Sequence, residues 1–94
     1  MEPRWTLRRR QSLSRRTWGD GAVVYDALSG STHLLDPIAA AVLDCLWIRD
    51  RSTAAVAAAV RSEISEDNAE DVLEAVGVAL AKLRDIGLVR STAQ

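Results

Sequence analysis

Few residues in this chain belong to the types that carry out chemistry. The 94 residues include one histidine, His33, and one cysteine, Cys45. A zinc site normally takes three or four His, Cys or acidic ligands, and a catalytic nucleophile needs a neighbouring base. The sequence also lacks CxxC and HxxxH spacings and the GxxxxGKS/T and GxGxxG loops that bind phosphates. We therefore expect a protein that is not an enzyme and that uses no metal ion or cofactor.

The two potentially reactive side chains have simpler interpretations. His33 lies in a strand-like run, so we predict that it faces solvent or bonds a backbone carbonyl, with contact to a bound segment as the alternative. Cys45 falls within an apolar helical pattern, which favours a packed core thiol over a reactive one. Because it is the only cysteine, the chain cannot form an internal disulfide.

Acidic residues cluster before and within the last predicted helix. The cluster comprises Glu63, Glu66, Asp67, Glu70, Asp71 and Glu74. Carboxylates can bind a metal ion, but acidic residues also suit the positive N-terminal end of a helix dipole and a solvated helix face. We favour the second interpretation.

The small net charge of −1 hides an asymmetry along the chain. Residues 1–16 contain six arginines and one acid, for a net charge of +5, whereas the remainder has six basic and twelve acidic residues, for −6. An arginine-rich N-terminal arm favours an anionic partner, and a nucleic acid is one alternative. The acidic third helix argues against it, because it would repel phosphates where a recognition helix must approach.

Arg15 and Arg16 invite comparison with a twin-arginine export signal. Such a signal requires an apolar segment directly after the arginines, whereas Trp18 is followed here by a Gly-Asp-Gly turn. No apolar run approaches the roughly 20 residues of a membrane span. We therefore expect a cytoplasmic protein that does not associate with membranes.

Turn and cap residues divide the chain into strands followed by helices. Ser29 and Gly30 separate two apolar runs, as a hairpin turn requires, and Asp36 and Pro37 suit the start of a helix. Ser52 can cap a second helix, and either Ser65 or Asp67 a third. The patterns predict strands at 5–7, 22–25 and 32–35, helices at 37–48, 53–62 and 67–86, and an extended segment at 88–89.

These elements predict an α+β fold that is winged-helix-like. A small N-terminal antiparallel three-stranded sheet is followed by three helices that cover it. A chain of this length forms one domain, residues 1–94, and we expect residues 1–4 and 91–94 to be frayed.

One edge of the third predicted helix is suited to binding. Leu73, Gly77, Leu80 and Arg84 fall at helical spacing along it. Glycine inside a helix costs about 1 kcal/mol relative to alanine, so either a ligand or another part of this domain approaches the backbone at Gly77. If residues 32–35 form an open strand edge beside this helix, the two make a groove for an extended peptide.

Several of these segments together resemble the PqqD family of small peptide chaperones, and within it the branch associated with HPr-kinase-related system A clusters. The resemblance covers residues 5–90 and is carried by Val24-Tyr25, Ser29-Gly30, Thr32-His33-Leu34-Leu35-Asp36, Ala39-Ala40, Val42-Leu43 and Gly87-Leu88-Val89. It implies a fold of three strands and three helices that binds the leader of a precursor peptide as an added strand and presents it to a maturation enzyme.

The resemblance also suggests the site and the partners. The motif places the peptide along Thr32, His33, Leu34 and Leu35, while helical spacing alone nominates Leu73, Gly77, Leu80 and Arg84 for the opposite wall. The implied partners are a leader peptide and a peptide-modifying enzyme, for which an HPr-kinase-related protein is one candidate. The arginine-rich arm would steer an acidic peptide or dock that enzyme. An exposed strand edge also permits a homodimer, and a purely structural subunit of a larger enzyme is a further alternative.

Overall fold

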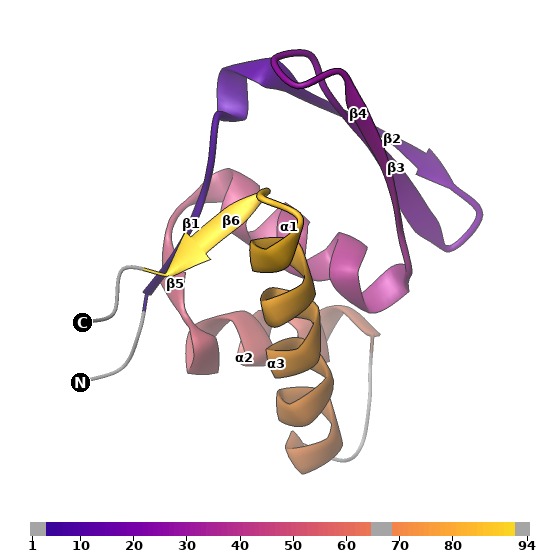
Figure 1. Ribbon diagram of the computed structural model, residues 1–94. Coiled ribbons are helices and arrows are strands. Elements are labelled where there is room, and N and C mark those ends of the chain that lie inside the picture. Colours follow the sequence, from indigo (N-terminus) through magenta and orange to yellow (C-terminus); the bar gives the residue numbers. More distant parts are fainter. Residues whose placement is uncertain (1–3, 65–68, 92–94) are drawn as a thin grey trace.

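The computed structural model describes residues 4–64 and 69–91, which form two small sheets and three helices (Figure 1). The strands are β1 (Arg4–Leu7), β2 (Leu13–Trp18), β3 (Gly21–Asp26), β4 (Ser31–Leu35), β5 (Arg51–Ser52) and β6 (Val89–Ser91). The helices are α1 (Pro37–Ile48), α2 (Thr53–Ile64) and α3 (Ala69–Asp85), with one 3-10 turn at Arg10–Ser12. This architecture confirms the predicted α+β fold.

The N-terminal sheet is an antiparallel meander in the order β2-β3-β4. Its register places Val24 opposite both Arg15 and His33, and Tyr25 opposite both Ser14 and Thr32. Residues that face each other across an antiparallel sheet lie on the same side of it. One side of this sheet packs on the helices, whereas the other is turned away from them (Figure 1).

The strand predicted at residues 5–7 exists, but it belongs to a second sheet. β1 pairs with β5 and β6, in the order β5-β1-β6. The first strand of the N-terminal sheet is instead β2, which begins within the predicted arginine-rich arm of residues 1–16 and ends beyond it at Trp18. Arg4 and Ser91, predicted to be frayed, lie in β1 and β6. The sequence of β2 hides its strand because Leu13 is its only buried residue.

The three helices supply most of the core. α1 has the predicted bounds, while α2 extends two residues beyond its predicted end at 62. The start predicted for α3 and both of its candidate caps, Ser65 and Asp67, lie outside the described residues. The fully buried side chains include Val42, Leu43 and Leu46 of α1, Val56 and Val60 of α2, and Val76, Leu80 and Leu83 of α3. Among the described residues, no helix is long and apolar enough to cross a membrane.

β4 passes directly into α1 through a tightly packed junction. The Asp36 carboxylate accepts a hydrogen bond of 2.8 Å from the backbone amide of Ala39, and Pro37 occupies the first helical position, as predicted. Gly21 of β3 presses against the same junction. A Cβ atom at Gly21 would lie 2.0 Å from the carbonyl oxygen of Leu35, so only glycine fits without moving the backbone.

We expect Gly21→Ala and Gly77→Ala to change stability in opposite directions. Gly21→Ala forces β3 and β4 apart and should lower the free energy of unfolding by about 1–3 kcal/mol. A Cβ atom at Gly77 meets nothing within 4 Å, so Gly77→Ala should raise it by up to about 1 kcal/mol through helix propensity. Urea unfolding of both variants measures the difference. Equal stabilities would show that the contact at Gly21 does not constrain the junction.

Candidate functional site

The candidate site begins at the outer edge of β4, the last strand of the N-terminal sheet. β4 pairs with β3 on one side, and within residues 4–64 and 69–91 no strand pairs with its other side. An edge strand displays N–H and C=O groups that can pair with another extended chain. The sheet therefore has room for one more strand beside β4.

The side chains of β4 alternate between the two sides of the sheet. His33 lies opposite Val24 and Leu35 opposite Ala22, both on the helix-facing side. Leu35 is buried in the core and His33 is partly buried. Thr32 and Leu34 are exposed on the outer side. A strand added at this edge would continue the alternation, with every second side chain turned toward the helices.

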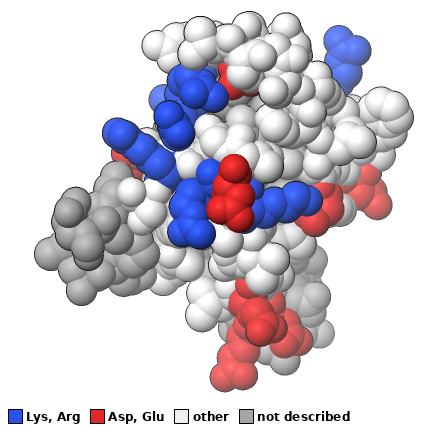
Figure 2. Space-filling view, viewed as in Figure 1, with Lys and Arg blue, Asp and Glu red and all other residues white. Residues whose placement is uncertain are grey.

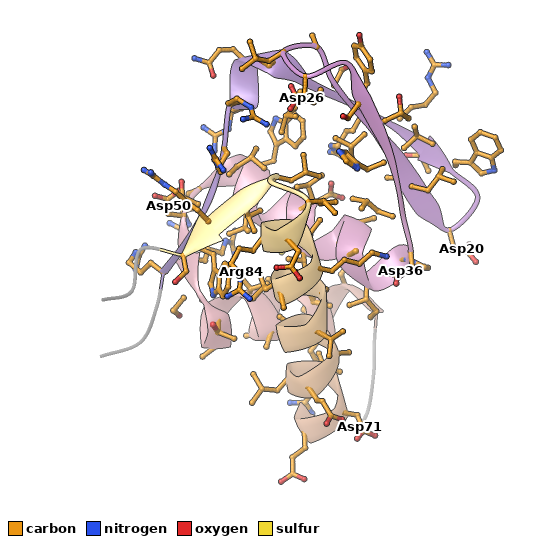
Figure 3. All side chains as sticks on the ribbon, in the orientation of Figure 1. Asp20, Asp26, Asp36, Asp50, Asp71 and Arg84 are labelled. Atoms are coloured by element: carbon orange, nitrogen blue, oxygen red, sulfur yellow. The ribbon has the colours of Figure 1, made fainter. Side chains whose placement is uncertain are left out.

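The α3 residues nominated from the sequence do not line this edge. Leu80 is fully buried in the core, so its side chain is not available to a ligand. Leu73 is exposed but lines a depression with Ala54, Ala57, Ala58 and Arg61, and so lies toward α2. In Figure 3, Arg84 lies on the left of α3, whereas Asp36, which follows β4, lies on the right. The structure thus brings Thr32, His33, Leu34 and Leu35 together but sets Leu73, Leu80 and Arg84 apart from them.

The opposite edge of α3 is the other candidate for a second wall. Lys82 follows Leu73 by about two and a half helical turns and therefore lies on the other side of the helix. Val78 is near it and is 66% exposed. A helical wheel identifies both edges of α3 but does not show which neighbour lies beside each, so no signal in the sequence distinguishes them.

Gly77 lies on an open surface of α3. No part of the described domain comes within 4 Å of the position that its Cβ would take, so no segment of the domain packs closely there. This removes one of the two explanations suggested by the sequence. The approach of a ligand to Gly77 stays a prediction.

Most of the predicted arginine-rich arm is engaged within the domain. Arg10 donates a hydrogen bond of 3.2 Å to the carbonyl of Leu46. Arg15 pairs with Asp44 of α1 and lies 5.4 Å from the ring centre of Trp47. Arg4 donates a hydrogen bond to the carbonyl of Asp50, and Arg9 donates one to the carboxylate of Asp26. The segment is therefore not a free arm, and most of its arginines stabilise the fold.

Asp26 and Arg9 form a partly buried ion pair that holds the turn before β4. Arg9 Nη2 lies 2.7 Å from Asp26 Oδ2, and the amide of Leu28 donates to Asp26 Oδ1 at 3.0 Å. Asp26 itself is buried. Burial raises the pKa of Asp26, but these hydrogen bonds and the charge of Arg9 outweigh it, so the net pKa is below its ordinary value.

The groups considered for metal binding or reactivity are either buried or exposed to solvent in the described part of the chain. Cys45 is buried in the core, and burial raises the pKa of its thiol, which disfavours the reactive thiolate. In the described part of the cluster, Glu63, Glu70, Asp71 and Glu74 are exposed, whereas Glu66 and Asp67 lie outside it. No group of three His, Cys, Asp or Glu residues in the described chain is arranged to hold a metal ion. Figure 2 shows acidic side chains gathered at the lower end of α3, far from most of the basic ones.

Comparison with known proteins identifies the fold. No protein-family model matches the sequence, and no curated protein matches it. Among solved structures, the chain is similar to TbiB1 in complex with the TbiA(beta) leader peptide. The TM-score is 0.72 at 18% sequence identity, and the match covers 95% of this chain and 99% of TbiB1. The chain therefore has the fold of TbiB1, a protein that has been solved with a leader peptide.

We expect the pairing of Asp26 to make stability sensitive to acid. Because its folded-state pKa is below the unfolded value of about 4, the carboxylate stabilises the fold above that pH, and this contribution is lost as the pH falls through the folded value. Between about pH 5 and pH 3 the native protein should lose more free energy of unfolding than Asp26→Asn does. Urea titrations at several pH values measure this loss.

Asp20→Asn is the matched control for this prediction. It removes an exposed carboxylate from the turn between β2 and β3 and should keep the acid sensitivity of the native protein. If Asp26→Asn retained the full loss of stability, the Arg9–Asp26 ion pair would not be its source.

Proposed function

We propose that this protein is a non-catalytic peptide chaperone of the PqqD type. It binds the leader of a ribosomally made precursor as a fourth strand of the N-terminal sheet and presents the peptide to a maturation enzyme. The observation that carries the proposal is the open outer edge of β4, in a chain with the fold of a protein solved with a leader peptide.

The added strand would obtain affinity and selectivity from different groups. Backbone hydrogen bonds to β4 supply affinity for any extended segment, while side-chain contacts select among segments. On the helix-facing side, a guest would meet His33 of β4. The Val78 and Lys82 edge of α3 replaces the edge containing Leu73 and Arg84 as the proposed second wall. A micromolar complex requires about −8 kcal/mol, which one strand of hydrogen bonds with two or three side-chain contacts can supply.

We expect substitutions on the two edges of α3 to affect peptide binding differently. Val78→Asp places a charge in the proposed groove and should weaken binding at least about tenfold, which corresponds to about 1.4 kcal/mol. Leu73→Asp makes the same kind of change on the α2 side and should leave the affinity within about twofold. Both residues are exposed, so both variants should fold. Isothermal calorimetry with leader peptides from the reading frames that neighbour the gene measures these affinities.

The reverse ranking would place the peptide on the α2 side of α3. The folded native protein could instead bind none of those leaders but associate tightly with an enzyme encoded beside its gene. In that case the protein is a structural subunit and the proposal fails. Circular dichroism checks that each variant is folded.

Proline substitutions in the two edge strands of the sheet test where the guest pairs. Proline removes a backbone donor, and successive residues of a strand direct their amides to opposite sides. Of the two variants Thr32→Pro and His33→Pro, one therefore removes a backbone donor from the free edge of β4. That variant should weaken leader binding at least about tenfold. Thr17→Pro in β2 is the matched control on the other edge of the sheet. The amide of Ala27 donates to the carbonyl of Ser12, so in this register the amide of Thr17 points away from β3. Equal weakening by Thr17→Pro would show that the guest does not pair with β4.

A further inference from the structure

The outer side of the N-terminal sheet carries large apolar side chains that nothing in the described domain covers. The register places Trp18, Val23, Tyr25 and Leu34 on this side. Trp18 and Leu34 are each 71% exposed and Tyr25 is 44% exposed. Most exposed apolar residues on a small domain are scattered, so a group gathered on one sheet face marks an interaction surface.

A depression in this face gives it a definite shape. It has a volume of about 370 Å³ and is lined by residues from all three strands, among them Arg16, Trp18, Tyr25 and Thr32. The aromatic rings at its sides suit an inserted apolar side chain, since aromatic residues give large contact area at low conformational cost. We call the surface formed by Arg16, Trp18, Val23, Tyr25 and Leu34 the outer sheet face.

The charge on the outer sheet face limits what can bind there. Arg16 lies opposite Val23 on this face, is exposed, and forms no ion pair with any described residue. Arg15 faces the helices instead, where it pairs with Asp44. By the strand register, no carboxylate of β2, β3 or β4 lies on the outer side. The face is therefore apolar with one unpaired cation.

We propose that the outer sheet face binds an amphipathic helix of a partner protein that places a carboxylate beside Arg16. A helix on this face would complete a three-layer arrangement, because the other side of the sheet already packs on α1. The same face of a second copy would offer Arg16 no carboxylate, because no acidic residue of β2, β3 or β4 lies on the outer side. A nucleic acid needs several phosphate contacts, and this face offers one unpaired cation. This surface uses the outward side chains of the sheet, Leu34 of β4 among them, rather than the free backbone edge of β4, and does not depend on peptide binding there.

Two synthetic helical peptides test the charge preference of the outer sheet face. Both carry Leu and Trp along one side, and they differ only in having Glu or Lys at the border of that side. We expect the Glu peptide to bind saturably, with NMR shifts in the amides of Arg16, Trp18 and Tyr25, and the Lys peptide to bind at least about tenfold more weakly. Arg16→Glu should reverse this order.

Substitutions at exposed apolar residues provide the matched controls. Trp18→Ser should weaken the Glu peptide at least about tenfold, whereas Ile48→Ser, which alters an exposed apolar residue at the end of α1, should leave it unchanged. Trp18→Ser should also leave leader binding at β4 intact, so the two proposals can fail separately.

Three outcomes would overturn this inference. Equal binding of the two peptides, or no effect of Arg16→Glu, would show only non-specific apolar adhesion. Shifts of the same amides on dilution of the protein alone would assign the face to self-association. Saturable binding of oligouridine at these residues would assign it to a single-stranded nucleic acid.

Discussion

The junction at which β4 becomes α1 is the constraint on which the candidate site depends. The backbone of Gly21 packs against the Leu35 carbonyl with no room for a side chain, and the Asp36 carboxylate holds the first turn of α1. The residues that follow β4 therefore enter the helix layer and cannot fold back as another strand beside β4. As a result β4 is held along one side by β3 and at its end by α1, while no strand of the described residues pairs with its other side.

The Arg9–Asp26 pair supports the opposite end of the same strand. Asp26 closes β3, and its carboxylate fixes the turn through the amide of Leu28, while Arg9 ties that turn back to the segment between β1 and β2. Arg15 makes a second tie from β2 to Asp44 of α1. The N-terminal arginines therefore stabilise the sheet that presents the open edge, which explains why so many occur in a domain with a slightly negative net charge.

The sequence predicts where helices and strands begin and end better than it predicts which of them pack or pair together. Asp36, Pro37 and the Ser29-Gly30 turn act through local contacts, so the hairpin and the start of α1 were predictable. β2 was missed because its strand is stabilised by pairing with β3 rather than by an apolar pattern of its own. The choice between the two edges of α3 could not be made either, since helical spacing alone does not say which neighbour lies on which side. Leu80 was misplaced for a related reason, because a residue at the border of an apolar stripe can be fully buried.

The most direct test of the account is to observe which backbone a bound leader peptide pairs with. Isotope-filtered NMR of the complex detects short distances between the backbone protons of the peptide and those of the protein strand with which it pairs, in either strand direction. The account predicts such contacts to residues 31–35 along the free side of β4. Contacts to β2, or to the surface between α2 and α3 without any to β4, would contradict it.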